Sequence, residues 1–140
     1  GLVRRIICIG NSLILADSAG PQIYSQLQHS NLPEDVELID GGTKGLDLLP
    51  FFDGAKLVIL IDQVSGYSSG SDVVLLQGGE LFKATEKRFD HQTGIGYLLR
   101  ILPEVCEVEL PELKMIGIEG CLNERKKQKC LNLLQQLLNI

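Results

Sequence analysis

Apolar residues follow two kinds of pattern along this chain. Some segments hold short, unbroken apolar runs, whereas others repeat leucine and isoleucine at helical spacing. The run at 57–61, Leu-Val-Ile-Leu-Ile, is apolar on both faces, which is typical of a central parallel strand covered by helices. By the same criterion we predict β-strands at residues 3–9, 36–39, 57–61, 73–76 and 114–118.

Helices are predicted between most of these strands. One begins at Gly20-Pro21, because proline is tolerated in the first helical turn, and it ends near residues 30–33. Three more are predicted at 46–52, 95–102 and 124–140. Pro50 interrupts the first of these three, and Pro103 ends the second. No helix separates the third and fourth strands, so the fourth is expected to run antiparallel at an edge of an α/β sheet.

Composition and charge narrow the class of protein. At 140 residues the chain is expected to form a single domain, 1–140, with a sizeable core. The net charge of −5 gives no basic surface for phosphate backbones, so we expect no nucleic-acid partner. No apolar run approaches the roughly 18 to 20 residues that span a bilayer, and no signal peptide is evident. We therefore expect a cytoplasmic protein with no membrane partner, and a monomer, because the sheet and helices account for the apolar residues.

The cysteines give no support for structural zinc or a disulfide framework. Cys8, Cys106, Cys121 and Cys130 form no C-x-x-C pair. Cys8 lies inside a predicted core strand, where a thiol behaves as a small hydrophobe and is badly placed to act as a nucleophile.

Acidic residues follow the first three predicted strands. Asp17 lies among apolar neighbours in the loop after the first strand, Asp40 follows the second, and Asp62 ends the third. The carboxyl ends of parallel strands meet at one edge of the sheet, where ligands bind in open α/β folds, so we expect these three together there. Each also has an ordinary interpretation: Asp17 can cap the next helix, and Asp62 can be a solvated loop residue.

Two further segments are candidates for this edge. Asp40-Gly41-Gly42-Thr43 indicates a sharp turn whose exposed backbone can approach a ligand or peptide, although an ordinary connection would read the same way. His91 lies in a polar loop before the helix at 95–102, where it is either solvated or able to reach a metal. Two carboxylates and an imidazole suit nickel, zinc, iron or a similar ion. The chain has no G-x-S-x-G, H-E-x-x-H or G-x-G-x-x-G motif, so serine-hydrolase, thermolysin-like and dinucleotide chemistry lack support.

At these residues the chain resembles the nickel-iron hydrogenase maturation proteases. The family pattern is a strand running into G-N-x-L-x-x-D-[DE]-x-x-G, then D-G-G-T, an apolar strand ending in aspartate, a loop histidine and a late strand with G-I-E. The chain has these pieces in the same order and spacing, as Gly10-Asn11-Ser12-Leu13, Asp17, Gly20, Asp40-Gly41-Gly42-Thr43, Asp62, His91 and Gly117-Ile118-Glu119.

The resemblance implies a fold, an activity and a site. The fold is three-layer α/β/α, with a twisted, mostly parallel five-stranded sheet of the phosphorylase/hydrolase-like kind. The activity is that of an endopeptidase that removes the C-terminal extension of the NiFe-hydrogenase large-subunit precursor after nickel insertion. Asp17, Asp62 and His91 would bind nickel brought by the substrate, or another divalent metal, and residues 40–43 (Asp40, Gly41, Gly42, Thr43) would take part in substrate recognition.

Departures from the family pattern keep other functions open. Ala16 replaces the first acidic residue of the usual pair, Ser18 replaces a glycine, and Gly120 stands where proline is common. A relative that binds the large subunit without cutting it is therefore the main alternative. A receiver-like signalling domain would also place aspartates after its first and third strands, but the chain lacks the Ser or Thr after strand four and the Lys after strand five that such a domain needs.

Overall fold

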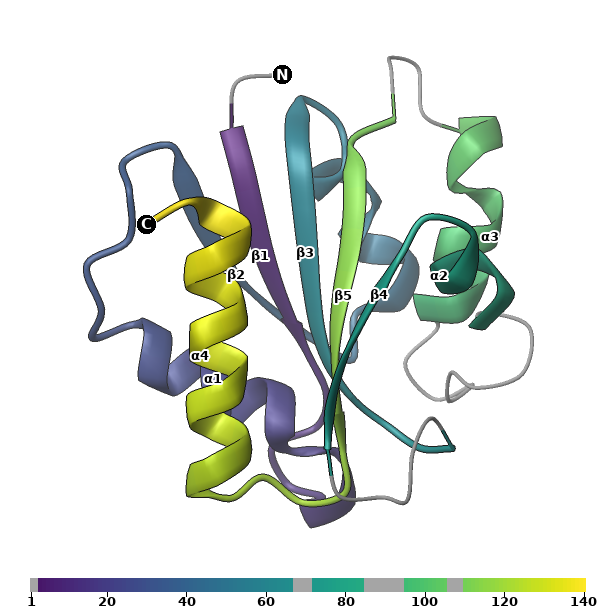
Figure 1. Ribbon diagram of the computed structural model, residues 1–140. Helices are drawn as coiled ribbons and strands as arrows, with labels where there is room; N and C mark the ends of the chain where they lie inside the picture. Colours follow the sequence, from purple (N-terminus) through teal and green to yellow (C-terminus); the bar gives the residue numbers. More distant parts are fainter. Residues whose placement is uncertain (1–2, 67–71, 85–94, 106–109) are drawn as a thin grey trace.

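The computed structural model describes residues 3–66, 72–84, 95–105 and 110–140 (Figure 1). Its core is a five-stranded sheet with the order β2-β1-β3-β5-β4. The strands are β1 (Val3–Ile9), β2 (Val36–Gly42), β3 (Ala55–Val64), β4 (Val73–Gln77) and β5 (Glu112–Glu119). Four of them are parallel, and β4 pairs antiparallel with β5 at one edge, as predicted from the missing helix between the third and fourth strands.

Helices cover both faces of the sheet (Figure 1). The helices α1 (Ala19–Leu27) and α4 (Glu124–Leu138) pack on one face. The other face carries the 3-10 helix η2 (Gly45–Phe51) and the helices α2 (Gly79–Ala84) and α3 (Ile95–Val105). A one-turn 3-10 helix, η1 (Leu15–Asp17), precedes α1. The chain thus has the three-layer α/β/α architecture that the resemblance implies.

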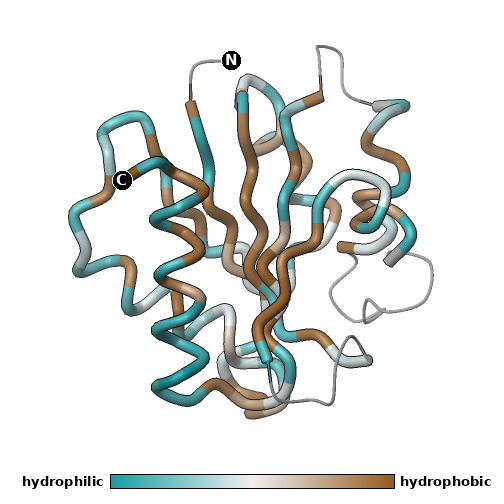
Figure 2. Tube along the Cα trace, viewed as in Figure 1, coloured by the Kyte–Doolittle hydropathy of each residue, from teal (hydrophilic) through white to brown (hydrophobic). Residues whose placement is uncertain are grey.

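The sheet is the most apolar part of the molecule (Figure 2). In β3, the residues from Val58 to Ile61 are fully buried, because helices cover both faces of this central strand. Alternate residues serve the two cores: Val58 and Leu60 face α3, whereas Ile59 and Ile61 face α1 and α4. The unbroken apolar run of the sequence therefore fills two separate cores.

Four strands, β2 to β5, are longer than predicted, and the extensions of β2 and β3 change the site. Strand β2 continues through Gly41 and Gly42, so the segment predicted as a sharp turn is mostly strand, and the turn follows at Thr43. Gly41 forms a β-bulge against β1, where a Cβ atom would lie only 2.8 Å from Cγ2 of Ile7. Strand β3 continues beyond Asp62 to Val64, so Asp62 lies within the strand rather than at its end.

Prolines interrupt the helices less than predicted. Pro103 lies inside α3, because the burial of Ile95, Leu98 and Leu102 against the sheet holds the helix to Val105. Pro50 lies inside η2, which runs through it as a single 3-10 segment. Helix α2 was not predicted, since its six residues are too few to show a helical period. Within the described residues, no helix is long and apolar enough to cross a membrane.

Candidate functional site

The loop after β1 folds back on itself and fixes Asp17. Gly10 has a φ of +139°, and a Cβ atom there would lie 2.3 Å from the carbonyl oxygen of Asp17, so only glycine fits where the loop closes. The backbone N–H of Asn11 then donates a hydrogen bond of 3.0 Å to Oδ2 of Asp17. Asp17 therefore neither caps α1 nor points freely into solvent: its half-buried carboxylate is tied to the carboxyl end of β1.

Asp62 belongs to the neighbouring strand β3, close to the same edge. Its side chain is 5% exposed, and Oδ1 accepts a hydrogen bond of 2.8 Å from the backbone N–H of Gln63. Since Leu60 and Val64 face the α3 core, Asp62 points to that face as well. Gln63 points the other way, and its Oε1 accepts a hydrogen bond of 3.1 Å from the N–H of Ala19 at the start of α1. The hydrogen bond between Gln63 and Ala19 ties β3 to α1 directly beside the loop of Asp17.

His91 lies outside the described residues. The helix that follows it, α3, begins at Ile95 and packs on the sheet face to which Asp62 points. Among the residues that the structure does describe, no group of three His, Cys, Asp or Glu side chains could hold a metal ion. The grouping of Asp17, Asp62 and His91 therefore stays a prediction.

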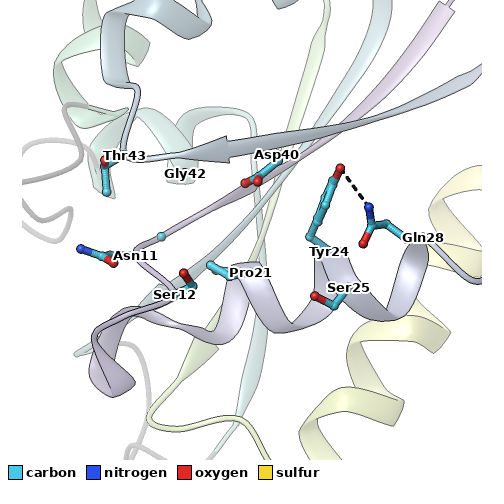
Figure 3. A pocket seen from close by; sticks show the side chains of 10 residues that line it. Asn11, Ser12, Pro21, Tyr24, Ser25, Gln28, Asp40, Gly42 and Thr43 are labelled. Atoms are coloured by element: carbon cyan, nitrogen blue, oxygen red, sulfur yellow. Dashed lines mark hydrogen bonds between the residues drawn. The ribbon is translucent and has the colours of Figure 1, made fainter.

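A cavity of about 410 Å³ opens beside this edge (Figure 3). Strand β2 and its turn form one side, α1 forms the other, and the first residues of the Asp17 loop lie between them. The lining residues are Gly10, Asn11, Ser12, Pro21, Tyr24, Ser25, Gln28, Asp40, Gly42 and Thr43. The walls are rich in hydroxyl, amide and carboxylate groups, so the cavity suits an extended peptide with polar backbone groups.

Three of the four residues predicted to recognise substrate line this cavity: Asp40, Gly42 and Thr43. Gly41 does not, because it is buried in the bulge of β2 against β1. Asn11 connects the cavity to the carboxylate, since its side chain lies at the cavity wall while its N–H binds Asp17. The cavity and Asp17 are therefore neighbours along the sheet edge.

Glu119 belongs to the Gly117-Ile118-Glu119 motif, but no role was predicted for it, and its surroundings are unusual. This residue ends β5 and is 1% exposed, and neither carboxylate oxygen has a hydrogen-bond partner in the described part of the chain. It pairs with Val64 in the sheet, so it lies on the same face as Asp62 and two residues further along. A glutamate directly after a run of apolar strand residues is the sequence signal that could have indicated a buried carboxylate here.

Lys126 fixes the backbone at the end of β5. Its buried ammonium group donates hydrogen bonds to the carbonyl oxygen of Glu119 and, at 3.2 Å, to that of Cys121. These two acceptors account for the burial of a cation on α4. The charge of the basic residues at the start of α4 alone would indicate a solvated face. Lys126 is an exception, because it is buried.

The two buried cysteines, Cys8 and Cys130, are not suited to nucleophilic catalysis. Burial raises the pKa of the Cys8 thiol well above its usual range and raises the pKa of Cys130 to about 12. Cys121 is exposed, and Cys106 lies outside the described residues. The interpretation of Cys8 as a core residue is supported.

Fold and site together define a class of protein. It is a three-layer α/β protein whose acidic side chains gather at the carboxyl edge of a parallel sheet, next to a polar groove. Comparison with known proteins gives the family. The model of the HycI hydrogenase maturation proteases matches residues 21–121, and the chain belongs to this family.

Individual relatives agree with this family. The chain is 35% identical over 92 residues to the hydrogenase expression/formation protein HupD of Rhodobacter capsulatus, a match of 64% of this chain and 44% of HupD. It is 29% identical over 116 residues to the hydrogenase 2 maturation protease of Escherichia coli K12, covering 81% of this chain and 70% of the relative. The chain thus spans less than half of the length of HupD.

Solved structures confirm the predicted fold. The hydrogenase maturating endopeptidase HybD of E. coli superposes with a TM-score of 0.78 at 24% identity, over 98% of this chain and 90% of that one. The [NiFe] hydrogenase maturation protease HybD of Thermococcus kodakarensis gives 0.73 at 21% identity, over 97% and 99%. The resemblance stated from the motifs is confirmed both as a family and as a fold.

Proposed function

We propose that this protein is an endopeptidase that removes the C-terminal extension of a NiFe-hydrogenase large-subunit precursor after nickel has been inserted. The observation that carries the proposal is the position of Asp17 and Asp62. In a chain of this family, Asp17 lies in the loop after β1 and Asp62 lies two residues before the end of the adjacent strand β3, close to the edge where a groove can hold an extended peptide.

The nickel is part of the substrate in this proposal. Held by the precursor's cysteines, it is bound in addition by Asp17, Asp62 and His91, and other divalent metals can occupy the same ligands. Carboxylate oxygen and imidazole nitrogen suit first-row ions. The backbone N–H groups of Asn11 and Gln63 orient the two carboxylates, as hydrogen bonds around metal ligands commonly do.

The peptide that carries the cut lies along the β2 side of the groove. Asp40 and Thr43 present polar side chains to it, and Gly42 leaves room for a close backbone approach. Bound nickel would mark a loaded precursor and fix the scissile bond against these residues. We expect the protein to act as a cytoplasmic monomer that has no nucleic-acid or membrane partner.

One observation favours a second candidate, a relative that binds the precursor without cutting it. Ala16 is exposed in η1 next to Asp17, at the position where the family pattern has the first of two acidic residues. The loop therefore offers one carboxylate where others offer two. A cleavage assay separates the two candidates.

The test compares nickel-loaded and nickel-free large-subunit precursor, each incubated with wild type, Asp17→Ala, Asp62→Ala and His91→Ala. We expect only the loaded precursor to be shortened, and we expect each substitution to lower the rate at least about a hundredfold, because a three-ligand site loses a third of its donors. The precursor's length is read by mass spectrometry.

Asp53→Ala is the matched control, since Asp53 is an exposed aspartate beyond the end of η2. It should process the precursor at the wild-type rate. Equal shortening of nickel-free precursor would overturn nickel recognition. Tight binding without shortening would establish the non-cleaving relative.

A further inference from the structure

Three consecutive apolar side chains point outward beside the site. Leu13 is 91% exposed, Ile14 44% and Leu15 70%, in the same loop that holds Asp17. Proteins rarely expose adjacent large apolar side chains without a partner. We call residues 13–15 the apolar shelf.

Hydrogen bonds within the loop hold the shelf outward. The N–H of Leu13 donates to Oδ1 of Asn11 at 2.9 Å, and that of Ile14 donates to the carbonyl oxygen of Asn11 at 3.1 Å. The N–H of Asp17 donates to the carbonyl oxygen of Ile14 at 2.9 Å. This backbone is ordered before any partner arrives, so a partner would not have to order it.

The shelf adjoins the substrate groove. A second cavity, of about 440 Å³, is lined by Ser12, Leu13, Leu15, Ser18, Pro21, Gln22 and Ser25. Three of these residues, Ser12, Pro21 and Ser25, also line the groove of Figure 3. The two cavities therefore meet at the first turns of α1, and an occupant of the groove extends naturally onto the shelf.

We propose that the apolar shelf docks an apolar surface segment of the large-subunit precursor, which places the precursor's C-terminal extension in the groove. This inference rests on the function proposed above. The serine and glutamine residues around Leu13 and Leu15 give the shelf the polar rim that transient interfaces have.

A second copy of this chain fits the shelf less well than the precursor does. A stable interface buries about 800 Å² on each partner, which is more than three side chains of one loop can supply. The shelf has the size of a small apolar anchor. The groove continues from it and supplies the rest of the contact.

The test measures binding and cleavage of nickel-loaded precursor with Leu13→Ser/Leu15→Ser. We expect the Kd to rise about tenfold or more, because two leucines lose their apolar contact, while kcat changes less than twofold. Leu13→Met/Leu15→Met should restore the wild-type Kd, since methionine keeps the apolar surface. Kd is obtained by calorimetry and kcat from saturating single-turnover cleavage.

Ile140→Ser is the matched control, because Ile140 is 58% exposed and lies at the C-terminus, away from the carboxyl end of β1 (Figure 1). It should leave the Kd unchanged. If wild type cleaves the precursor and Leu13→Ser/Leu15→Ser binds it as tightly as wild type does, the docking inference fails and the proposed function stands. If wild type neither binds nor cleaves, both fail. Sedimentation tests the remaining alternative. If wild type is a dimer and Leu13→Ser/Leu15→Ser is a monomer, the shelf binds a second copy of this chain and the inference is overturned.

Discussion

A backbone group of the same loop helps to position Asp17. The N–H of Asn11, which every residue but proline can supply, donates a hydrogen bond to the Asp17 carboxylate, and the close approach depends on Gly10. Substitutions at position 11 should therefore leave the Asp17 carboxylate in place, whereas a side chain at position 10 would displace it. A fixed carboxylate needs less reorganisation when it receives a metal.

Glu119 is a buried acidic residue whose carboxylate has no hydrogen-bond partner among the described residues. Both of its carboxylate oxygens are inaccessible and without a hydrogen-bond partner there. Burying an unpaired carboxyl group lowers the free energy of unfolding. Lys126 does not compensate it, because its ammonium group binds the backbone carbonyl of Glu119.

We therefore expect Glu119→Gln to raise the free energy of unfolding by about 1 kcal/mol, since an amide is buried at a smaller penalty than a carboxylate. Urea unfolding at neutral pH measures the change. Glu34→Gln, at an exposed position, should leave the midpoint unchanged. A clear loss of stability in Glu119→Gln would mean that the carboxylate has a stabilising partner.

Helix α1 lies unusually close to β1, and one glycine permits it. A Cβ atom on Gly20 would lie 2.0 Å from the carbonyl oxygen of Ile9 and 2.9 Å from its nitrogen. These contacts are with backbone, so no side-chain movement could relieve them. Close packing brings the first turn of α1 to the groove and lets Ala19 bind Gln63.

Gly20→Ala should lower the free energy of unfolding by about 3 kcal/mol, because α1 must move away from β1. Gly79→Ala provides the comparison, since its Cβ at the start of α2 would have no heavy atom within 4 Å in the described part of the chain, apart from its chain neighbours and its own helix backbone. It should match or slightly exceed wild-type stability. Equal urea midpoints for the two variants would show that α1 can shift without strain.

The elements show how far sequence patterns reach. All five strands were predicted, because helical layers make each of them apolar in an obvious way. Their ends were not: β3 runs on through the polar Asp62 and Gln63, since pairing with β5 continues beyond the apolar core. Pro103 was expected to end its helix, but burial of the leucines before it outweighs the lost hydrogen bond.

The site was predictable to the extent that it depends on motifs. Motif order placed Asp17 and Asp62 at one sheet edge, and strand pairing agrees with that placement. The roles of Asn11 and Gln63 were not predicted. Their hydrogen bonds involve backbone N–H groups, so they depend on which segments the fold brings together and not on a recognisable residue type. Gly41 was misassigned, because a glycine in a bulge and a glycine in a turn look alike in sequence.

At the scale of the molecule, ion pairs and hydrogen bonds of charged side chains link the sheet to segments that are distant in the sequence. Arg4 of β1 binds Asp35 through two hydrogen bonds, of 2.7 and 3.0 Å, and also donates to the carbonyl oxygen of Leu138 at the end of α4. Near the opposite end of α4, Lys129 binds Asp72 beside β4 at 2.6 Å. Both pairs join segments that are distant in the sequence.

These pairs make stability depend on acidity. The hydrogen bond from Arg4 lowers the pKa of Asp35 below its ordinary value of 3.8, and that from Lys129 does the same for Asp72. A carboxyl group with a lowered pKa in the folded state stabilises the fold fully above its unfolded pKa. That contribution is lost as the pH falls from 3.8 through the lowered folded value.

Asp35→Asn should therefore be less stable than wild type at pH 7, and the difference should shrink as the pH falls below 3.8, where wild type also loses its charge. Urea midpoints of both proteins across this range measure the gap. Asp47→Asn, at an exposed position of η2, should have the wild-type urea midpoint at pH 7. A difference in urea midpoint between wild type and Asp35→Asn that stays constant into acid would contradict this prediction. Asp35 would then act through its shape and neutral hydrogen bonding, and the charge of its pair with Arg4 would add nothing to the attachment of α4.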